Sequence, residues 1–209
     1  MRLDATQALT RLKEGNQRFV QGLLSLDALL SHAQARRDQI AAAQEPFAVI
    51  LGCSDSRAPA EILFDQGLGD LFVIRVAGNI AAPSQIASVE FAVERFGVEL
   101  VVVLGHSNCG AIAATLDCMQ RREEAPVGLR AVVDRIRPAL APLADLPFGV
   151  EPENLMRHAV HANVRATAHL LRSGSQLLEQ KVLAGSLAIV GADYDIASGA
   201  VQFFDDAPR

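Results

Sequence analysis

Two short loops of the sequence carry the residue types that bind metals and move protons. The first loop contains Cys53, Asp55 and Arg57, and the second, about fifty residues later, contains His106 and Cys109. Two thiols and one imidazole suit Zn²⁺, which accepts sulfur and nitrogen ligands in tetrahedral geometry. Three protein ligands leave the fourth position open, and an open position is typical of a catalytic zinc site rather than a structural one.

Asp55 and Arg57 have the spacing of a pair that orients a reacting water. Residues two apart in an extended segment point to the same side. A bidentate contact would keep Asp55 ionised, fixed and available as a hydrogen-bond acceptor. Asp55 is also the nearby candidate for a fourth metal ligand. We therefore expect an inactive state at low pH in which Asp55 leaves Arg57 and takes the open position.

Each part of this pattern also has a simpler interpretation. A single cysteine is often a small buried apolar side chain, and Cys118, with no ligand pattern around it, is expected to be a free thiol. An Asp-x-Arg pair is commonly a surface ion pair. A disulfide between Cys53 and Cys109 remains open, although an intracellular setting disfavours it. The combination of both loops, each directly after an expected buried strand, favours the metal site.

Apolar runs that are typical of buried strands alternate with helical patterns along the chain. The runs are Phe47–Leu51, Leu71–Ile74, Leu100–Leu104 and Leu187–Val190, and helical spacing covers Pro83–Phe96. This alternation predicts an α/β fold in which helices flank a mostly parallel central β-sheet. Because ligands of such sheets bind beyond the carboxyl ends of the strands, both loops should face one crevice.

The two ends of the chain carry further local signals. Asp4 and Gln7 form a capping box for a helix that stops near Gly22, and a second helix is expected over Ala33–Ala43. Near the C-terminus, Val201–Phe204 should return as a hairpin strand against the preceding one.

We expect residues 1–209 to form a single domain. Its parts would be an N-terminal helical arm (1–45), a sheet core (46–118 and 187–205) and a mainly helical connection (119–186). Five prolines lie between Met119 and Glu153 and predict an irregular stretch there with one broken helix.

Composition and charge exclude several classes of protein. Of the 209 residues 50% are hydrophobic and 21% are charged, which is ordinary globular composition. The net charge of −5 provides no basic face for nucleic acid, and the apolar runs fall far short of the roughly 20 residues that span a membrane. The N-terminus does not read as a signal peptide, and three cysteines make a disulfide framework improbable. We expect a cytoplasmic protein without nucleic-acid or membrane partners.

The order of the motifs resembles that of the β-class carbonic anhydrases over most of the chain. The likeness runs through Glu14–Val20, Cys53–Arg57, Phe72–Ile80, Ser88–Val93, Val101–Ala111, Ile189–Gly191 and Tyr194–Gly199. The resemblance implies a β-carbonic anhydrase-like fold, with one Zn²⁺ per chain bound by Cys53, His106 and Cys109 and an Asp55–Arg57 dyad beside it. It also implies reversible hydration of CO₂ to bicarbonate and a proton through a zinc-bound hydroxide. The expected assembly is a homodimer or homotetramer with the active site at the dimer interface.

The resemblance further implies a substrate pocket. Gln44 falls where the family has a glutamine that binds substrate, and Phe72 matches a pocket phenylalanine. Phe91 stands where other members carry tyrosine, and Ala77 replaces a larger aliphatic residue at the pocket wall. Gly110 would offer its backbone N–H to bicarbonate.

Some members bind bicarbonate at a second, inhibitory site built from Trp, Arg and Tyr. Arg75 and Tyr194 stand at matching spacings, but Ile50 takes the tryptophan position and the chain contains no Trp. We therefore expect that this second site is not formed in that way.

Two other functions share these residues. A hydrolase of COS or CS₂ on the same scaffold would use the same metal ligands. A non-catalytic zinc–thiolate scaffold or redox protein would not need the Asp55–Arg57 pair. Nucleotide binding is the poorest candidate, because Gly67–Gly69 is not followed by the start of a helix. Packing or surface roles are expected for the histidines outside the motifs, and none is identified as a proton shuttle: His32, His158, His161 and His169.

Overall fold

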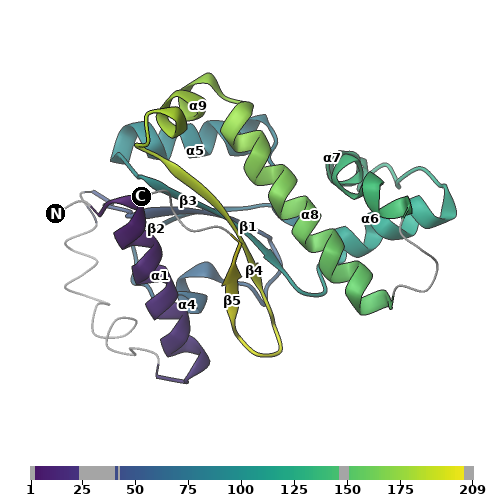
Figure 1. Cartoon of the computed structure of the whole chain (residues 1–209), viewed down its shortest axis with the longest axis horizontal. Helices are drawn as coiled ribbons and strands as arrows, with labels where there is room; N and C mark the ends of the chain where they lie inside the picture. Colours follow the sequence, from purple (N-terminus) through teal and green to yellow (C-terminus); the bar gives the residue numbers. More distant parts are fainter. Residues whose placement is uncertain (1–2, 24–40, 42, 146–150, 205–209) are drawn as a thin grey trace.

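The computed structural model describes residues 3–23, 41, 43–145 and 151–204, and within them the central element is a five-stranded sheet (Figure 1). Its spatial order is β2-β1-β3-β4-β5. Neighbouring strands from β2 to β4 are parallel, and β5 returns antiparallel to β4. The strands are β1 (Ala48–Gly52), β2 (Leu71–Arg75), β3 (Leu100–His106), β4 (Ala188–Tyr194) and β5 (Val201–Phe203). The predicted mostly parallel sheet and the C-terminal hairpin are thus confirmed.

The strand register brings the carboxyl ends of β1 and β3 together. Every residue of these two central strands is buried, which explains their continuous apolar sequence. Gly52, the last residue of β1, pairs with Arg75 on one side and with Leu104 on the other. The loops that follow β1 and β3 therefore leave the sheet side by side at one edge.

Helices cover both faces of the sheet and divide the core in two. On one face α5 and α8 pack against the strands, with α6, α7 and α9 packed against α8, and the other face packs against α1 and α4 (Figure 1). The first group is α5 (Pro83–Phe96), α6 (Gly110–Arg121), α7 (Arg130–Leu140), α8 (Pro152–Ser173) and α9 (Gln176–Leu183). The second group is α1 (Ala5–Val20) and α4 (Ala60–Leu63), and two 3₁₀ turns complete the described elements, η1 (Ala77–Asn79) and η2 (Ala141–Asp145).

Helix α1 starts as the sequence predicts. The Asp4 side chain accepts from the backbone N–H of Gln7, and the Gln7 side chain accepts from that of Asp4, which completes the capping box. Further along, Gly15 allows close packing on α4, because a Cβ there would lie 1.8 Å from the Phe64 carbonyl oxygen.

Asn16 joins α1 to two distant segments of the chain. Its side-chain amide donates to the carbonyls of Leu63 (3.1 Å) and Gly199 (3.0 Å), and its Oδ1 accepts from the N–H of Val201 (2.8 Å). The side chain is buried, so these bonds satisfy backbone groups that water cannot reach. Asn16 thereby fixes the turn between β4 and β5 against the helix.

The connection after β3 is more regular than the prolines led us to expect. Helix α6 continues to Arg121, and α7 runs without a break through Pro138. Pro138 stands two residues before the end of α7, where a missing backbone N–H removes only one late hydrogen bond. In the described part of 119–153, residues 122–129 are irregular as expected, whereas the expected break in a helix was wrong, because α7 is continuous.

Two expectations are not settled by these elements. The expected helix over Ala33–Ala43 lies outside the described residues except for positions 41 and 43. The division of a single domain into arm, core and connection stays a prediction. Among the described helices, none is both long and apolar enough to cross a membrane.

Candidate metal centre

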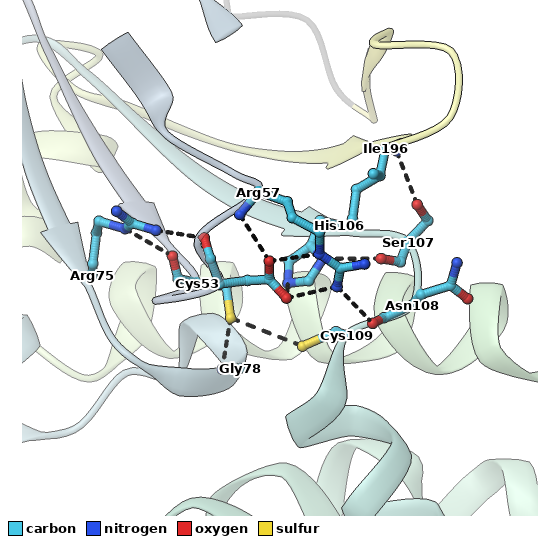
Figure 2. A network of polar contacts seen from close by, with 10 residues as sticks. Cys53, Arg57, Arg75, Gly78, His106, Ser107, Asn108, Cys109 and Ile196 are labelled. Atoms are coloured by element: carbon cyan, nitrogen blue, oxygen red, sulfur yellow. Dashed lines mark hydrogen bonds and ion pairs between the residues drawn. The ribbon is translucent and has the colours of Figure 1, made fainter. Parts of the chain in front are cut away.

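Cys53, His106 and Cys109 converge at the edge of the sheet where β1 and β3 end (Figure 2). Cys53 follows β1 directly, His106 is the last residue of β3, and Cys109 is the N-cap of α6. One ligand atom from each residue lies within 4.8 Å of the other two, and all three residues are buried. The structure thus joins the two halves of the metal motif that the sequence separates.

The two sulfur atoms are spaced for a shared metal ion rather than a disulfide. Cys53 Sγ and Cys109 Sγ lie 4.0 Å apart, and both cysteines are free. A disulfide would require about 2 Å. Two Zn–S bonds of about 2.3 Å in tetrahedral geometry would separate the sulfurs by about 3.8 Å. The open alternative of a Cys53–Cys109 disulfide is therefore not what the structure shows.

The His106 ring presents one nitrogen to this site. Its Nδ1 lies 2.9 Å from the Ser107 carbonyl oxygen, so Nδ1 carries the proton and donates it to that oxygen. Its Nε2 is buried and has no hydrogen-bond partner among the described residues. A buried nitrogen without a partner is costly. A metal ion held by Nε2 and the two sulfurs would remove that cost, so these residues fit the group.

The contact between the two thiols shifts their pKa values in opposite directions. The hydrogen bond from the Cys109 thiol lowers the pKa of Cys53. The nearby His106 lowers this pKa further, whereas burial of the thiol acts to raise it. The same contact with Cys53, together with burial, raises the pKa of Cys109. A divalent cation bound between the two sulfurs would displace their protons.

Asp55 and Arg57 form the bidentate pair that their spacing predicts. Arg57 Nε donates to Asp55 Oδ1 (2.9 Å), Arg57 Nη2 donates to Oδ2 (2.7 Å), and the Arg57 backbone N–H also donates to Oδ1 (3.0 Å). These bonds from Arg57 hold the pKa of Asp55 well below its usual range. Asp55 Oδ2 lies 3.9 Å from His106 Nε2, so the carboxylate stands beside the metal ligands without occupying their centre.

Neighbouring segments brace both ligand loops. The backbone N–H of Gly78 donates to Cys53 Sγ (3.4 Å), and the buried Asn163 side chain donates to the Gly78 carbonyl (2.8 Å). Ser107 donates its backbone N–H to the Tyr194 carbonyl (2.9 Å), and its hydroxyl accepts from the N–H of Ile196 (3.0 Å). Sequence reasoning missed these contacts. The Gly78–Asn79 dipeptide after a strand was the available signal for a special backbone at that point.

The expected pocket residues fall into two separate groups. Ala77 and Gly110 adjoin the metal ligands, since Ala77 precedes Gly78 and Gly110 opens α6 next to Cys109. Phe72 instead packs with Phe91 (ring centroids 6.2 Å apart) and with Phe96 (5.9 Å).

Gln44 belongs with the second group. It is exposed and precedes β1, four residues before Ala48, whereas the metal ligands follow the other end of that strand. Phe72 stands near the start of β2, in register with Val49 near the start of β1. Gln44 and Phe72 thus lie at the amino ends of the strands, opposite the metal ligands of their own chain.

The residues at the positions of the family's second bicarbonate site make other contacts in this structure. Ile50 is fully buried in the core, and Tyr194 is also buried. The Arg75 guanidinium donates to the backbone carbonyls of Cys53 and Asp55. Arg75 thus contacts the metal-ligand loop itself.

The remaining candidate residues lie away from the centre or outside the described residues. His161 Nε2 lies 3.0 Å from Asp193 Oδ2, and its ring packs against that of Phe204 at a tilt of 52°. His158 and His169 are exposed, and His32 lies outside the described residues. Cys118 is a free, partly buried thiol.

Comparisons with known proteins agree with this geometry. A family model described as carbonic anhydrase matches residues 48–201. The chain is 41% identical to a carbonic anhydrase of Mycolicibacterium smegmatis over 91% of its own length and 89% of the relative, and 40% identical to carbonic anhydrase 2 of Mycobacterium tuberculosis over 93% and 90%. Its fold matches the structure of the β-carbonic anhydrase CcaA with a TM-score of 0.75 and 28% identity, covering 96% of this chain and 92% of that one. This chain, in sequence and in fold, belongs to the β class of the carbonic anhydrase family.

Proposed function

We propose that the protein catalyses the reversible hydration of CO₂ to bicarbonate and a proton, with one Zn²⁺ held by Cys53, His106 and Cys109. The observation that carries this proposal is the buried Cys-His-Cys group with an ionised, oriented carboxylate directly beside it. A structural zinc site has no need for such a carboxylate next to an open position. Family membership and relatives of about 40% identity named carbonic anhydrase support the same reaction.

Zinc, when bound, would act as a Lewis acid that lowers the pKa of its bound water to about 7. The protein's part is to orient that water. Asp55 stays ionised because Arg57 holds both carboxylate oxygens, so it acts as a hydrogen-bond acceptor and not as a proton store. Arg57 Nη2 also lies 3.4 Å from the Asn108 carbonyl, which ties the pair to the second ligand loop.

The first turn of α6 is placed to receive the anionic product. Gly110 begins this helix, and no other residue approaches within 4 Å of where its Cβ would stand. The unpaired N–H groups at a helix start favour negative charge. The Gly110 N–H would therefore bind a bicarbonate oxygen while exposed Ala77 leaves the approach uncrowded.

We further propose that Gln44, Phe72 and Phe91 complete the pocket of a second copy of the chain. The five residues of β1 span about 16 Å, which puts Gln44 out of reach of the Cys53 site in its own chain. Phe91 is 53% exposed, an unusual position for an aromatic side chain in a cluster of three. A homodimer in which this cluster faces the partner's metal site would supply both the polar and the apolar side of the pocket.

Stopped-flow CO₂ hydration by the zinc-loaded protein tests the reaction. We expect activity that rises with pH, is lost on chelation and falls by a factor of about 100 or more in Asp55→Ala. Cys118→Ser, at the free thiol outside the site, is the matched control and should keep its zinc and its rate. A protein with one zinc per chain that hydrates no CO₂ but hydrolyses COS would refute the proposal in favour of the other substrate. An Asp55→Ala variant that keeps both its hydration rate and its zinc would refute the role of that carboxylate.

Mixing two inactive variants tests the shared pocket. Asp55→Ala and Gln44→Ala are combined, dissociated and reassembled. If each site takes Asp55 from one chain and Gln44 from the other, half of the dimers are mixed and each regains one intact site, so about a quarter of the parent activity returns. If both residues serve within one chain, mixing restores nothing.

A further inference from the structure

The guanidinium of Arg75 bridges the end of one strand and the loop that leaves its neighbour. Arg75 is the last residue of β2 and pairs in register with Gly52, the last residue of β1. Its Nε donates to the Cys53 carbonyl (3.0 Å), and its Nη2 donates to the Asp55 carbonyl (2.5 Å); Arg75 is at the left of Figure 2. Backbone carbonyls beyond the end of a β-ladder need other hydrogen-bond donors. Here the planar guanidinium of Arg75 supplies a donor to each of two such carbonyls.

The residues that follow Arg75 extend this contact. The N–H of Val76 donates to the Gly52 carbonyl (3.1 Å), and the N–H of Gly78 donates to Cys53 Sγ (3.4 Å). The backbone on both sides of Cys53 and its sulfur are thus all held by the segment from β2 to η1. The position of this ligand depends on the neighbouring strand as much as on its own loop.

Two arginines bind different groups of Asp55. Arg57 binds the carboxylate, and Arg75 binds the backbone carbonyl of the same residue. That carbonyl also accepts from the N–H of Ala58 (3.1 Å), so Arg75 connects the local turn to the sheet. A lysine could reach one of the two carbonyls but lacks the fork that holds both.

We propose that Arg75 is a positioning residue that fixes the Cys53–Asp55 loop, and thereby sets the place of a metal ligand and of the carboxylate beside it. This inference rests on the metal site proposed above but not on its substrate. Without the guanidinium, the carbonyls of Cys53 and Asp55 lose their link to β2, and the loop gains freedom to move. Contacts of this kind behind metal ligands are typically worth 10- to 100-fold in metal affinity or activity.

The experiment compares Arg75→Ala and Arg75→Lys with Arg135→Ala. Arg135 is a matched control, because it is an exposed arginine on α7 that also donates to a backbone carbonyl, that of Ala131 (2.9 Å), outside the site. Three measurements are made well below the melting temperature. They are the rate of zinc release to a chromogenic chelator, the visible spectrum of the Co²⁺-substituted protein, and the steady-state kinetics of CO₂ hydration, which give kcat and KM. The first two do not depend on activity.

We expect Arg75→Ala to release zinc at least about tenfold faster, to change the Co²⁺ spectrum and to lose at least about tenfold in kcat with a smaller change in KM. Arg75→Lys should lie between Ala and the parent, and Arg135→Ala should match the parent. Zinc release and spectrum within twofold of the parent in Arg75→Ala would overturn the inference. So would a variant whose only change is weaker inhibition by added bicarbonate, which would make Arg75 an anion-binding residue. If the parent hydrates no CO₂ yet Arg75→Ala releases zinc faster, the proposed reaction fails and this inference stands.

Discussion

Gly78→Ala probes how closely the turn η1 must pack for Cys53 to be held. Gly78 has a φ of +69°, and a Cβ there would lie 2.7 Å from Ile136 Cδ1 and 3.1 Å from Ala111 Cβ. The left-handed backbone costs an alanine about 1–2 kcal/mol, of which about 0.4–1 kcal/mol is returned through the unfolded chain. Overpacking adds about 1–3 kcal/mol. We therefore expect unfolding by urea to show a loss of about 2–4 kcal/mol.

A second glycine separates the two contributions. Gly185 has the same φ of +69° but no atom within 4 Å of its Cβ position, so Gly185→Ala should lose only roughly 1 kcal/mol. Ile136→Val removes the Cδ1 atom that the new methyl group meets. In the Ile136→Val background, Gly78→Ala should therefore cost markedly less than in the parent. Equal losses for Gly78→Ala and Gly185→Ala, or no relief from Ile136→Val, would refute the packing explanation.

Three more outcomes follow from the contacts described above. Cys109→Ser should fail to retain one zinc per chain by elemental analysis and lose the stabilisation that metal binding gives, whereas Cys118→Ser keeps both; equal zinc content in the two variants would contradict the ligand assignment. Asn16→Ala removes the partner of three backbone groups, two in buried and one in a partly buried hydrogen bond, and should lower the free energy of unfolding by about 3–5 kcal/mol; a loss below about 1 kcal/mol would show that water replaces the side chain. Because Arg57 lowers the pKa of Asp55, the carboxylate contributes stability above its unfolded pKa of about 3.9 that is lost as the pH falls through its lower folded value. Urea unfolding of the zinc-free parent and Asp55→Asn should thus differ by a constant amount from about pH 5 to about pH 8 and converge below about pH 4, and a difference that grows on acidification would reverse the sign of this reasoning.

The sheet and the Cys-His-Cys group could be predicted from the sequence because each depends on a local pattern. Continuous apolar runs identified the parallel strands, and in such a sheet the carboxyl ends share one edge. That rule alone brings Cys53 next to His106 and Cys109, although about fifty residues separate them. The two-residue spacing of Asp55 and Arg57 likewise determined their contact, since both partners lie in one loop.

The contacts of Arg75, Asn163 and Ser107 depend on the register of strands and the approach of helices, which no local pattern contains. Arg75 matched a family position for anion binding by its spacing, yet its side chain reaches the neighbouring loop because Gly52 stands opposite it in the sheet. Pro138 misled the prediction in another way. A proline in the sequence indicates that a helix interior is unfavourable at that position, but it does not show where the helix ends. Here α7 ends two residues after Pro138.

The placement of Gln44 and Phe72 predicts how activity should depend on protein concentration. The Cys-His-Cys group and the Asp55–Arg57 pair lie at the carboxyl ends of β1 and β3, whereas Gln44 and Phe72, which we propose to face the substrate, lie at the amino ends of β1 and β2. If the proposed dimer forms the pocket, a single chain would hold its metal ion while its substrate pocket remained incomplete. Zinc content would then be independent of protein concentration, but activity per chain would fall on dilution below the dimer dissociation constant. Measuring both across a dilution series separates these cases, because a pocket complete within one chain predicts constant specific activity throughout.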